Sequence, residues 1–362
     1  MKNTFGDVLS VTLFGESHGM AIGAVLDGVA PGIKIDERFI SHQLDLRRPQ
    51  GSISTPRKET DKFKIISGVK NGYTCGTPVC IIIENKDTQS QDYNDFLSMP
   101  RPSHADFTGR EKYHGFEDTA GGGHFSGRIT AALVAAGAII IPALNKKGIY
   151  IGTHIKEICD VKDKDFCDFK KDIEYLSNEH FAVIDKSSAE KMQETILSAA
   201  KNWDSVGGIL ETAVIGVPAG VGEPWFDTVE GKLSHALFSV PAVKGVEFGA
   251  GFGFAQMKGS TANDSFTVSD GKIITETNNN GGILGGITSG MPIIFRTAVK
   301  PTPTISLLQK TVDMETLTEK EIKGKGRHDP CIVHRARVVV DSLVALTLAD
   351  MLSIRFGTDW LA

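Results

Sequence analysis

The 362-residue sequence lacks the features that define several large classes of protein. Its formal net charge is -5, whereas general nucleic-acid binders need a basic excess to displace counterions. Its 5 cysteines are odd in number and include no Cys-x-x-Cys pair, so neither a disulfide framework nor a structural zinc site is indicated. We therefore expect free thiols, no metal site and no nucleic-acid partner.

Membrane and targeting signals are also missing. The N-terminal segment carries Asp7 and Glu16 and lacks the apolar core of a signal peptide. The most apolar stretch, residues 131–144, is shorter than the roughly 20 residues that a membrane-spanning helix needs. We expect a cytoplasmic protein with no membrane partner.

Neither a G-x-G-x-x-G fingerprint nor a G-x-x-x-x-G-K-[ST] loop occurs, which disfavours a doubly wound nucleotide-binding sheet. No Ser/Pro-rich linker or low-complexity tract divides the chain, so we expect one domain over residues 1–362. The 39 glycines gather in short clusters that predict tight turns between strands. The fold class that these features favour is α+β, with antiparallel sheets covering buried helices.

Local patterns predict the individual elements. Strand-like runs cover residues 8–14, 21–26, 79–84, 210–217, 291–295 and 336–340. Asp36 is expected to cap a helix that runs to Arg48 and is stopped by Pro49, and residues 129–144 form a buried helix interrupted near Pro142. A capping box at Ser187 opens another helix, and residues 341–356 form a C-terminal helix.

The first motif that carries chemistry is Gly15-Glu16-Ser17-His18-Gly19. It satisfies the G-x-S-x-G pattern of serine hydrolases, which places the serine on a turn between a strand and a helix. Here the residues after Gly19 read as a second strand, so a hairpin turn that presents Ser17 and His18 is favoured. A serine hydrolase built on Ser17 remains the alternative.

Two further motifs combine histidine, arginine and glycine. In Arg101-Pro102-Ser103-His104-Ala105-Asp106, Asp106 is expected to orient a ring nitrogen of His104. The Gly-rich stretch 121–128 leads into the buried helix, where free backbone N–H groups and the side chains of Ser126 and Arg128 favour phosphate binding.

Basic residues recur in three other segments. Arg327 and Asp329 lie in a Gly-rich turn, Arg47 and Arg48 end the first predicted helix, and the segment 300–304 presents a lysine and two hydroxyls. Arginine is suited to carboxylate and phosphate oxygens, and histidine transfers protons near neutral pH. The pattern indicates an enzyme with a multiply anionic substrate; a non-catalytic phosphate-binding module is a third reading.

Seven motifs taken together resemble the chorismate synthase family. FGESHG, RPSHAD, GGGHFSGR, PAVKG, GGILGGITSG, KPTPT and GRHDPC occur in the family's order between residues 14 and 331. The resemblance implies a β-α-β sandwich with buried central helices between antiparallel sheets. It also implies anti-1,4-elimination of phosphate from 5-enolpyruvylshikimate 3-phosphate. The expected cofactor is reduced FMN, with NADPH as a source of reducing equivalents, and the expected assembly is a homotetramer. With this cofactor, the non-catalytic alternative is a flavin-binding module.

The resemblance further implies roles for individual residues. His18 is the general acid toward the leaving phosphate, His104 acts on the reduced flavin, and Asp329 assists proton removal. Substrate binding falls to Ser17, Arg47, Arg48, Arg101, Arg128 and Arg327. FMN binding falls to Arg47, His124, Phe125, Ser126, Pro241, Ala242, Gly285, Lys300, Pro301, Thr302, Pro303, Thr304 and Arg327.

The sequence departs from the family pattern at two positions. His124 replaces an arginine that many relatives carry, which moves the predicted phosphate contact to Ser126 or to backbone N–H groups. Ile53 replaces a second arginine, so an anion or nicotinamide contact there is not expected.

Overall fold

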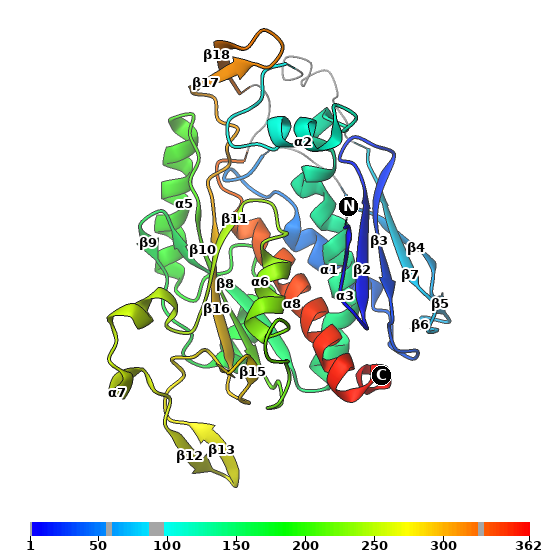
Figure 1. Cartoon of the computed structure of the whole chain (residues 1–362), viewed down its shortest axis with the longest axis vertical. Coiled ribbons are helices and arrows are strands. Elements are labelled where there is room, and N and C mark those ends of the chain that lie inside the picture. Colours follow the sequence, from blue (N-terminus) through cyan, green and yellow to red (C-terminus); the bar gives the residue numbers. More distant parts are fainter. Residues whose placement is uncertain (1, 56–59, 87–97, 325–328) are drawn as a thin grey trace.

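The computed structural model describes residues 2–55, 60–86, 98–324 and 329–362. Two five-stranded antiparallel sheets enclose a central layer of helices (Figure 1). That layer contains α1 (Glu37–Arg47), α3 (Thr130–Lys146) and α8 (Val333–Phe356). The predicted α+β sandwich with buried helices between antiparallel sheets is confirmed.

The first sheet has the strand order β1-β2-β3-β7-β4. Its strands are β1 (Thr4–Phe5), β2 (Ser10–Gly15), β3 (Ala21–Asp27), β7 (Val79–Glu84) and β4 (Phe63–Ser67). Strand β7 alternates as a half-buried strand must, with Val79, Ile81 and Ile83 fully buried. The register pairs Gly15 with Ile22 and Ala21 with Glu84, which brings the β2–β3 turn beside the end of β7.

The second sheet has the order β11-β16-β10-β8-β9. Its strands are β11 (Val243–Phe248), β16 (Ile293–Val299), β10 (Gly208–Ile215), β8 (Tyr150–Ile158) and β9 (Val161–Lys162). Helix α8 packs on one face of this sheet, and α4 (Phe169–Leu176) and α5 (Lys186–Lys201) pack on the other.

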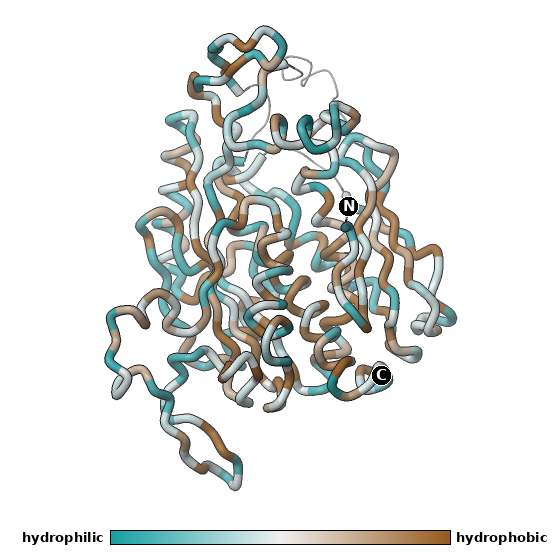
Figure 2. The backbone as a smooth tube through the Cα atoms, in the orientation of Figure 1, coloured by the Kyte–Doolittle hydropathy of each residue, from teal (hydrophilic) through white to brown (hydrophobic). Residues whose placement is uncertain are grey.

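Helix α3 is apolar nearly all round, α8 is buried along most of its length, and brown segments are frequent in the central layer in Figure 2. One stretch, Gly127–Lys146, is long and apolar enough to cross a membrane, but 78% of its most apolar window is buried inside the protein, as in a core helix. Helices α3 and α8 approach closely at Gly137, where an added Cβ would lie 2.4 Å from Cβ of Ser342. Glycine is needed there because any side chain would force the two helices apart.

Three local predictions were wrong. Residues 336–340, predicted as a strand, belong to helix α8. Burial between two sheets stabilises an apolar helix there despite its β-branched residues. Helix α3 continues through Pro142 without ending. The N-cap of α5 is Asp185, whose carboxylate accepts from the N–H of Ser187 at 3.0 Å. The predicted cap of α1 by Asp36 is confirmed.

Shorter elements complete the chain. The helices are α2 (Asp106–Tyr113), α6 (Val229–Leu237) and α7 (Gly259–Ala262), with 3-10 turns at Ala120–Phe125, Gly127–Ile129, Gly251–Gln256 and Thr358–Leu361. The remaining strands are β5 (Val69–Lys70), β6 (Tyr73–Thr74), β12 (Phe266–Ser269), β13 (Lys272–Thr275), β14 (Ile283–Leu284), β15 (Ile287–Thr288), β17 (Leu308–Asp313) and β18 (Thr318–Lys323). The β12–β13 hairpin projects away from the sandwich in Figure 1.

A buried carboxylate in α8 ties the start of the chain to its end. Asp350 is fully buried, and its oxygens accept from the backbone N–H groups of Asp7, Val8 and Leu9 at 2.8–3.1 Å. The ammonium of Lys232, in α6, lies 3.5 Å from the same carboxylate. Several donors and one cation thus offset the cost of burying the charge.

Candidate active site

A cavity of about 900 Å³ opens between the Gly-rich stretch before α3, the segment that carries α2 and the ends of α1 and α8. Most of the residues predicted for the site line it: Arg47, Arg48, Arg101, His104, His124, Phe125, Ser126, Arg128, Pro241, Ala242, Lys300, Thr302, Pro303 and Asp329. These residues come from six separate segments of the sequence. The fold therefore assembles the predicted site in one place.

Five described residues of the predicted set do not line this cavity: Ser17, His18, Gly285, Pro301 and Thr304. Ser17, His18 and Thr304 contact residues that do line it. Gly285 lies in the turn of the β14–β15 hairpin, where open space surrounds its Cβ position, and its neighbour Gly286 packs against Thr228, the N-cap of α6. Arg327 lies outside the described residues.

The predicted hairpin turn between β2 and β3 carries Ser17 and His18. Gly15 adopts a φ of 95°, a conformation that glycine tolerates at little cost. The backbone of Gly121, which lines the cavity, lies against the His18 ring, since an added Cβ would be 2.0 Å from its Cε1. His18 is therefore held at the edge of the cavity by a glycine that no other residue could replace without displacing the ring.

The turn is not a nucleophile elbow. Ser17 is 1% exposed, its hydroxyl donates to the carbonyl of Ala120 at 3.1 Å, and its oxygen lies 3.0 Å from Nδ1 of His18. Because the single hydroxyl proton goes to Ala120, the imidazole is the donor in the second contact. A strand, β3, follows the turn in place of a helix, so the geometry does not support the serine hydrolase reading.

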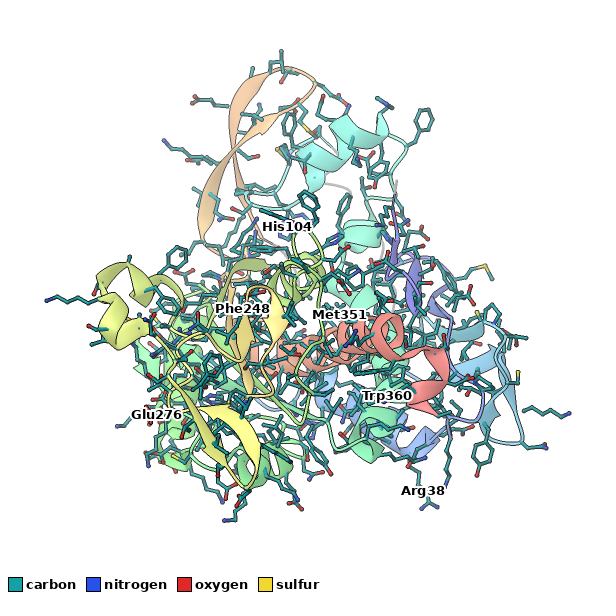
Figure 3. The ribbon with its side chains drawn as sticks, turned by 60° about the horizontal axis from the view of Figure 1, so that its bottom comes forward. Arg38, His104, Phe248, Glu276, Met351 and Trp360 are labelled. Carbon is teal, nitrogen blue, oxygen red and sulfur yellow. The ribbon has the colours of Figure 1, made fainter. Side chains whose placement is uncertain are left out.

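His104 lies where the segment that carries α2 and the β17–β18 hairpin joins the body of the protein (Figure 3). Its Nε2 is 2.5 Å from the hydroxyl of Thr304. Asp106 forms a bidentate pair with Arg101 at 2.7 and 2.8 Å, and the charge of nearby His104 is among the causes that lower the pKa of Asp106, so the orientation of His104 by Asp106 stays a prediction. Burial alone would raise the pKa of Asp106, but the hydrogen bonds and charge of Arg101 lower it overall.

A buried carboxylate that the sequence reasoning missed joins two predicted substrate ligands. Asp61 is 4% exposed, and its two oxygens pair with Arg47 at 3.3 Å and with Arg128. Arg47 also donates to the hydroxyl of Thr130 at 2.9 Å and to the carbonyl of Gly127 at 2.8 Å. Both guanidinium groups are thus fixed in the cavity wall, and Asp61 offsets part of their charge.

Asp329 is held by two neighbours. One oxygen accepts from the backbone N–H of Thr55 at 2.9 Å, and the other pairs with Arg335. Arg335 also donates from Nε to the carbonyl of Arg47 at 3.0 Å, so it joins α8 to the end of α1. The guanidinium of Arg48, at the same helix end, pairs with Asp45.

The Gly-rich stretch folds into a tight turn before α3. Gly121, Gly122 and Gly123 all have positive φ, at 62°, 85° and 52°. His124, at the departure from the family pattern, is 2.8 Å from the carbonyl of Gly15 through Nδ1. Since a carbonyl only accepts, Nδ1 carries the proton and Nε2 remains for other contacts. Ser126 caps the next turn by accepting from the N–H of Arg128 at 3.3 Å.

The cavity suits a flat aromatic group that carries a phosphate. Its apolar wall includes Phe125, Phe238, Pro241 and Ala242. The hydroxyl of Thr302 also lines it and is buried without a hydrogen-bond partner among the described residues, a costly arrangement that a bound polar ligand would relieve. The residues present therefore fit a flavin mononucleotide of the kind that the family resemblance implies.

Burial makes one basic group of the cavity easier to deprotonate. The pKa of Lys300 is lowered, first by burial and then by the charge of Lys244. Its ammonium donates to the carbonyl of Ser103 at 2.7 Å, next to His104. An anion bound beside it would favour its charged form.

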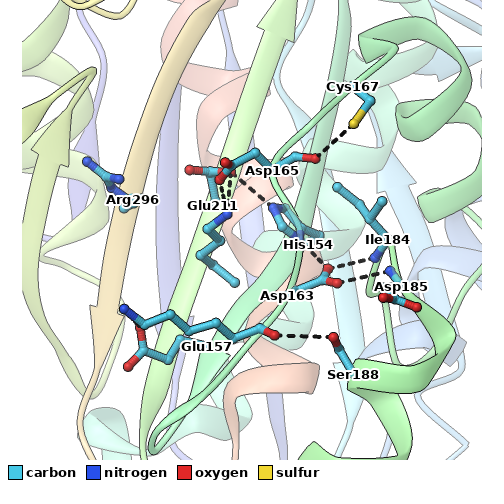
Figure 4. A network of polar contacts seen from close by, with 12 residues as sticks. His154, Glu157, Asp163, Asp165, Cys167, Ile184, Asp185, Ser188, Glu211 and Arg296 are labelled. Atoms are coloured by element: carbon cyan, nitrogen blue, oxygen red, sulfur yellow. Dashed lines mark hydrogen bonds and ion pairs between the residues drawn. The ribbon is translucent and has the colours of Figure 1, made fainter.

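A second polar cluster lies away from the cavity, on the α4–α5 side of the second sheet (Figure 4). His154 is fully buried between Asp163 at 2.8 Å and Glu211 at 3.1 Å. Burial would lower the pKa of His154, but the two carboxylates raise it overall. Within the described part of the chain, no group of three or more His, Cys, Asp or Glu residues is arranged to hold a metal ion.

Fold and cavity together define an α+β protein with a basic, histidine-containing cavity of the kind that suits anions. The model of the chorismate synthase family matches residues 9–353, and the chain belongs to that family. The chorismate synthase of Pyrococcus abyssi (strain GE5 / Orsay) is 48% identical over 97% of each chain. That of Thermococcus gammatolerans (strain DSM 15229 / JCM 11827 / EJ3) is 46% identical over 96% of each.

A solved structure agrees with these relatives. A crystal structure of chorismate synthase superposes with a TM-score of 0.77 at 30% identity, and the match covers 98% of this chain and 94% of that one. The family that the sequence motifs resemble is thereby confirmed.

Proposed function

We propose that the protein is a carbon–oxygen lyase that converts 5-enolpyruvylshikimate 3-phosphate to chorismate. The observation that carries the proposal is the single cavity that collects the motif residues of six segments in a chain of this family. In the reaction the C–O bond to phosphate breaks, a ring proton leaves and a new double bond forms. No net oxidation occurs.

The substrate carries two carboxylates and a phosphate, which the basic residues of the cavity complement. Arg47, Arg48, Arg101 and Arg128 line it, and a planar guanidinium matches such oxygens. His18, at the cavity edge, donates a proton to the departing phosphate. Asp329, fixed by Thr55 and Arg335, accepts the ring proton.

The cofactor that we propose is reduced FMN, with NADPH as a source of reducing equivalents. Reduced FMN supplies electron density for phosphate loss. The unpartnered hydroxyl of Thr302 and the apolar wall at Phe125 support this assignment. His104 holds a proton at this site, and the hydrogen bond between its ring and the hydroxyl of Thr304 supports this role.

Three further properties are part of the proposal. One hydrophobic core cluster extends over both sheets and the central helices, which supports a single domain over residues 1–362. A cytoplasmic location and a homotetramer rest on family membership.

The test is an anaerobic assay of phosphate release from 5-enolpyruvylshikimate 3-phosphate with reduced FMN, with and without NADPH. We expect turnover with reduced FMN, and a roughly hundredfold or greater loss in His18→Ala if that residue is the general acid. Phosphate release equal to a no-enzyme control would overturn the proposal. An unchanged rate in His18→Ala would remove that role alone.

A further inference from the structure

The turn that carries Ser17 and His18 is held by a residue from outside its own hairpin. Strand β7 ends at Glu84, paired with Ala21 at the start of β3. The next residue, Asn85, therefore lies beside the β2–β3 turn, where its N–H donates to the carbonyl of Met20 at 3.1 Å.

The side chain of Asn85 bridges both ends of this turn. Its amide nitrogen donates to the carbonyls of Glu16 and Gly19, each at 2.9 Å. These two carbonyls bracket Ser17 and His18. A primary amide has two N–H donors, so both are used to fix the turn.

The other end of the same amide faces the cavity wall. Its oxygen accepts from Nε of Arg128 at 3.0 Å, and Arg128 is paired in turn with Asp61. This network also fixes the orientation of the amide, since the reverse orientation would set an oxygen against two carbonyls and an NH₂ against a guanidinium. Asn85 thus connects the buried arginine–aspartate cluster to the turn.

We infer that Asn85 is a positioning residue that sets the His18 ring for proton transfer at the cavity. The inference rests on the proposed function. Asn85 does not line the cavity, so it acts through His18 rather than by contact with substrate. A misplacement of about 1 Å in a reacting group can lower a rate roughly a hundredfold, and the loss of two turn-closing donors is a cause of such misplacement.

The decisive substitution is Asn85→Asp, which keeps the shape of the side chain and its acceptor for Arg128. It replaces the donor pair with an oxygen that repels the carbonyls of Glu16 and Gly19. We expect kcat to fall roughly tenfold or more. KM should change less, because Arg128 keeps its ion pair with Asp61 and still has an oxygen acceptor at position 85. Asn85→Ser, which removes the side-chain bridge without adding charge, is the second variant should Asn85→Asp fail to fold.

A double-mutant cycle with His18→Ala separates positioning from general destabilisation. If Asn85 acts through His18, Asn85→Asp lowers kcat in the wild-type background and changes it less than about twofold in the His18→Ala background. An equal loss in both backgrounds, or no loss in the wild type, would overturn the inference. Lys86→Ala, at an exposed neighbour whose ammonium lies 3.9 Å from Glu84, is the matched control and should leave kcat unchanged.

The imidazole NMR signals of His18 in the ligand-free protein give a readout that does not depend on activity. Asn85→Asp and Asn85→Ser should shift them, whereas Lys86→Ala should not. If the wild-type protein releases no phosphate, the proposed reaction fails, while this shift still decides whether Asn85 holds the ring. Unshifted His18 signals in both Asn85 variants would overturn the positioning role even in an active enzyme.

Discussion

The backbone of Gly121 lies flat against the imidazole of His18, with the position of an added Cβ only 2.0 Å from Cε1 and 2.1 Å from Nδ1. Together with the amide of Asn85 on the other side of the turn, this contact leaves the ring little freedom. Gly121 comes from the Gly-rich stretch before α3, and Asn85 follows strand β7. Both residues restrict the imidazole that we assign as the general acid.

Substitution Gly121→Ala should therefore lower kcat at least tenfold, because the new methyl group displaces His18. Gly121 also has positive φ, so backbone strain must be separated from the clash. Gly115→Ala is the control: its φ of 78° is equally unsuited to alanine, but open space surrounds it. Steady-state assays should show a loss only for Gly121→Ala, and equal losses would rule out the steric explanation.

Two buried threonine hydroxyls without partners among the described residues allow a test of cofactor binding. Thr302 lines the cavity, whereas Thr297, in β16, does not. Replacing either by valine removes an unsatisfied polar group, so the free energy of unfolding should stay the same or rise by about 1 kcal/mol. Only Thr302→Val should weaken FMN binding, roughly fivefold, as measured by calorimetric titration. Unchanged FMN affinity would remove Thr302 from the cofactor site.

The stability of the protein should depend on pH through His334. This ring is buried and 2.8 Å from the hydroxyl of Ser54, and burial followed by the charge of Arg335 lowers its pKa to about 3. A lowered folded-state pKa means that the stabilisation is complete above the unfolded value of 6.5 and is lost as pH falls toward 3. Over that window His334 should contribute a slope of up to about 1.4 kcal/mol per pH unit.

Urea unfolding between pH 4 and pH 8 measures this slope, and His334→Gln should flatten it. The exposed His114, replaced by Asn, is the control and should leave it unchanged. Asp341 works in the opposite sense, since burial raises its pKa to about 6 and its contribution is lost as pH rises through that value. A wild-type and a His334→Gln curve that run parallel would contradict the assignment.

The sequence motifs located most of the site, and the structure shows why they did not locate all of it. Short motifs that combine glycine, histidine and arginine can be recognised directly in the sequence. Asn85 and Asp61 carry no such signature, because their partners Arg128 and Arg47 lie 43 and 14 residues away. Their importance arises only when the β3–β7 register and the end of α1 bring these segments together.

The secondary structure was likewise predictable where local patterns determine it and not where distant contacts do. Alternating or continuous apolar runs predicted β2, β3, β7, β10, α3 and the later part of α8. The run Ala336–Val340 was misread as a strand because its valines favour extended backbone locally. This segment is helical because it is buried between two sheets. That burial depends on residues more than 100 positions away, so the local sequence gives no signal of it.

Ser17 should resist covalent labelling. A fluorophosphonate needs a hydroxyl that is exposed and activated by a base, whereas this one is 1% exposed and donates to Ala120. Ser17→Ala should lower kcat about fivefold, since it removes one hydrogen bond to His18. Mass spectrometry of the treated protein checks the first expectation, and a stoichiometric adduct on Ser17 would restore the hydrolase reading.

The carboxylate of Asp350 has a consequence for how the protein is made. It closes contacts across 341 to 343 residues with the segment at Asp7 to Leu9, and α8 contacts both sheets and α3. A nascent chain that has not yet exposed α8 therefore has α1 and α3 in its central layer, but the apolar faces of both sheets and of α3 that α8 covers stay exposed. Because such long-range closures are slow and exposed apolar faces aggregate, we expect the fold, and with it the cavity, to form only after α8 has emerged from the ribosome.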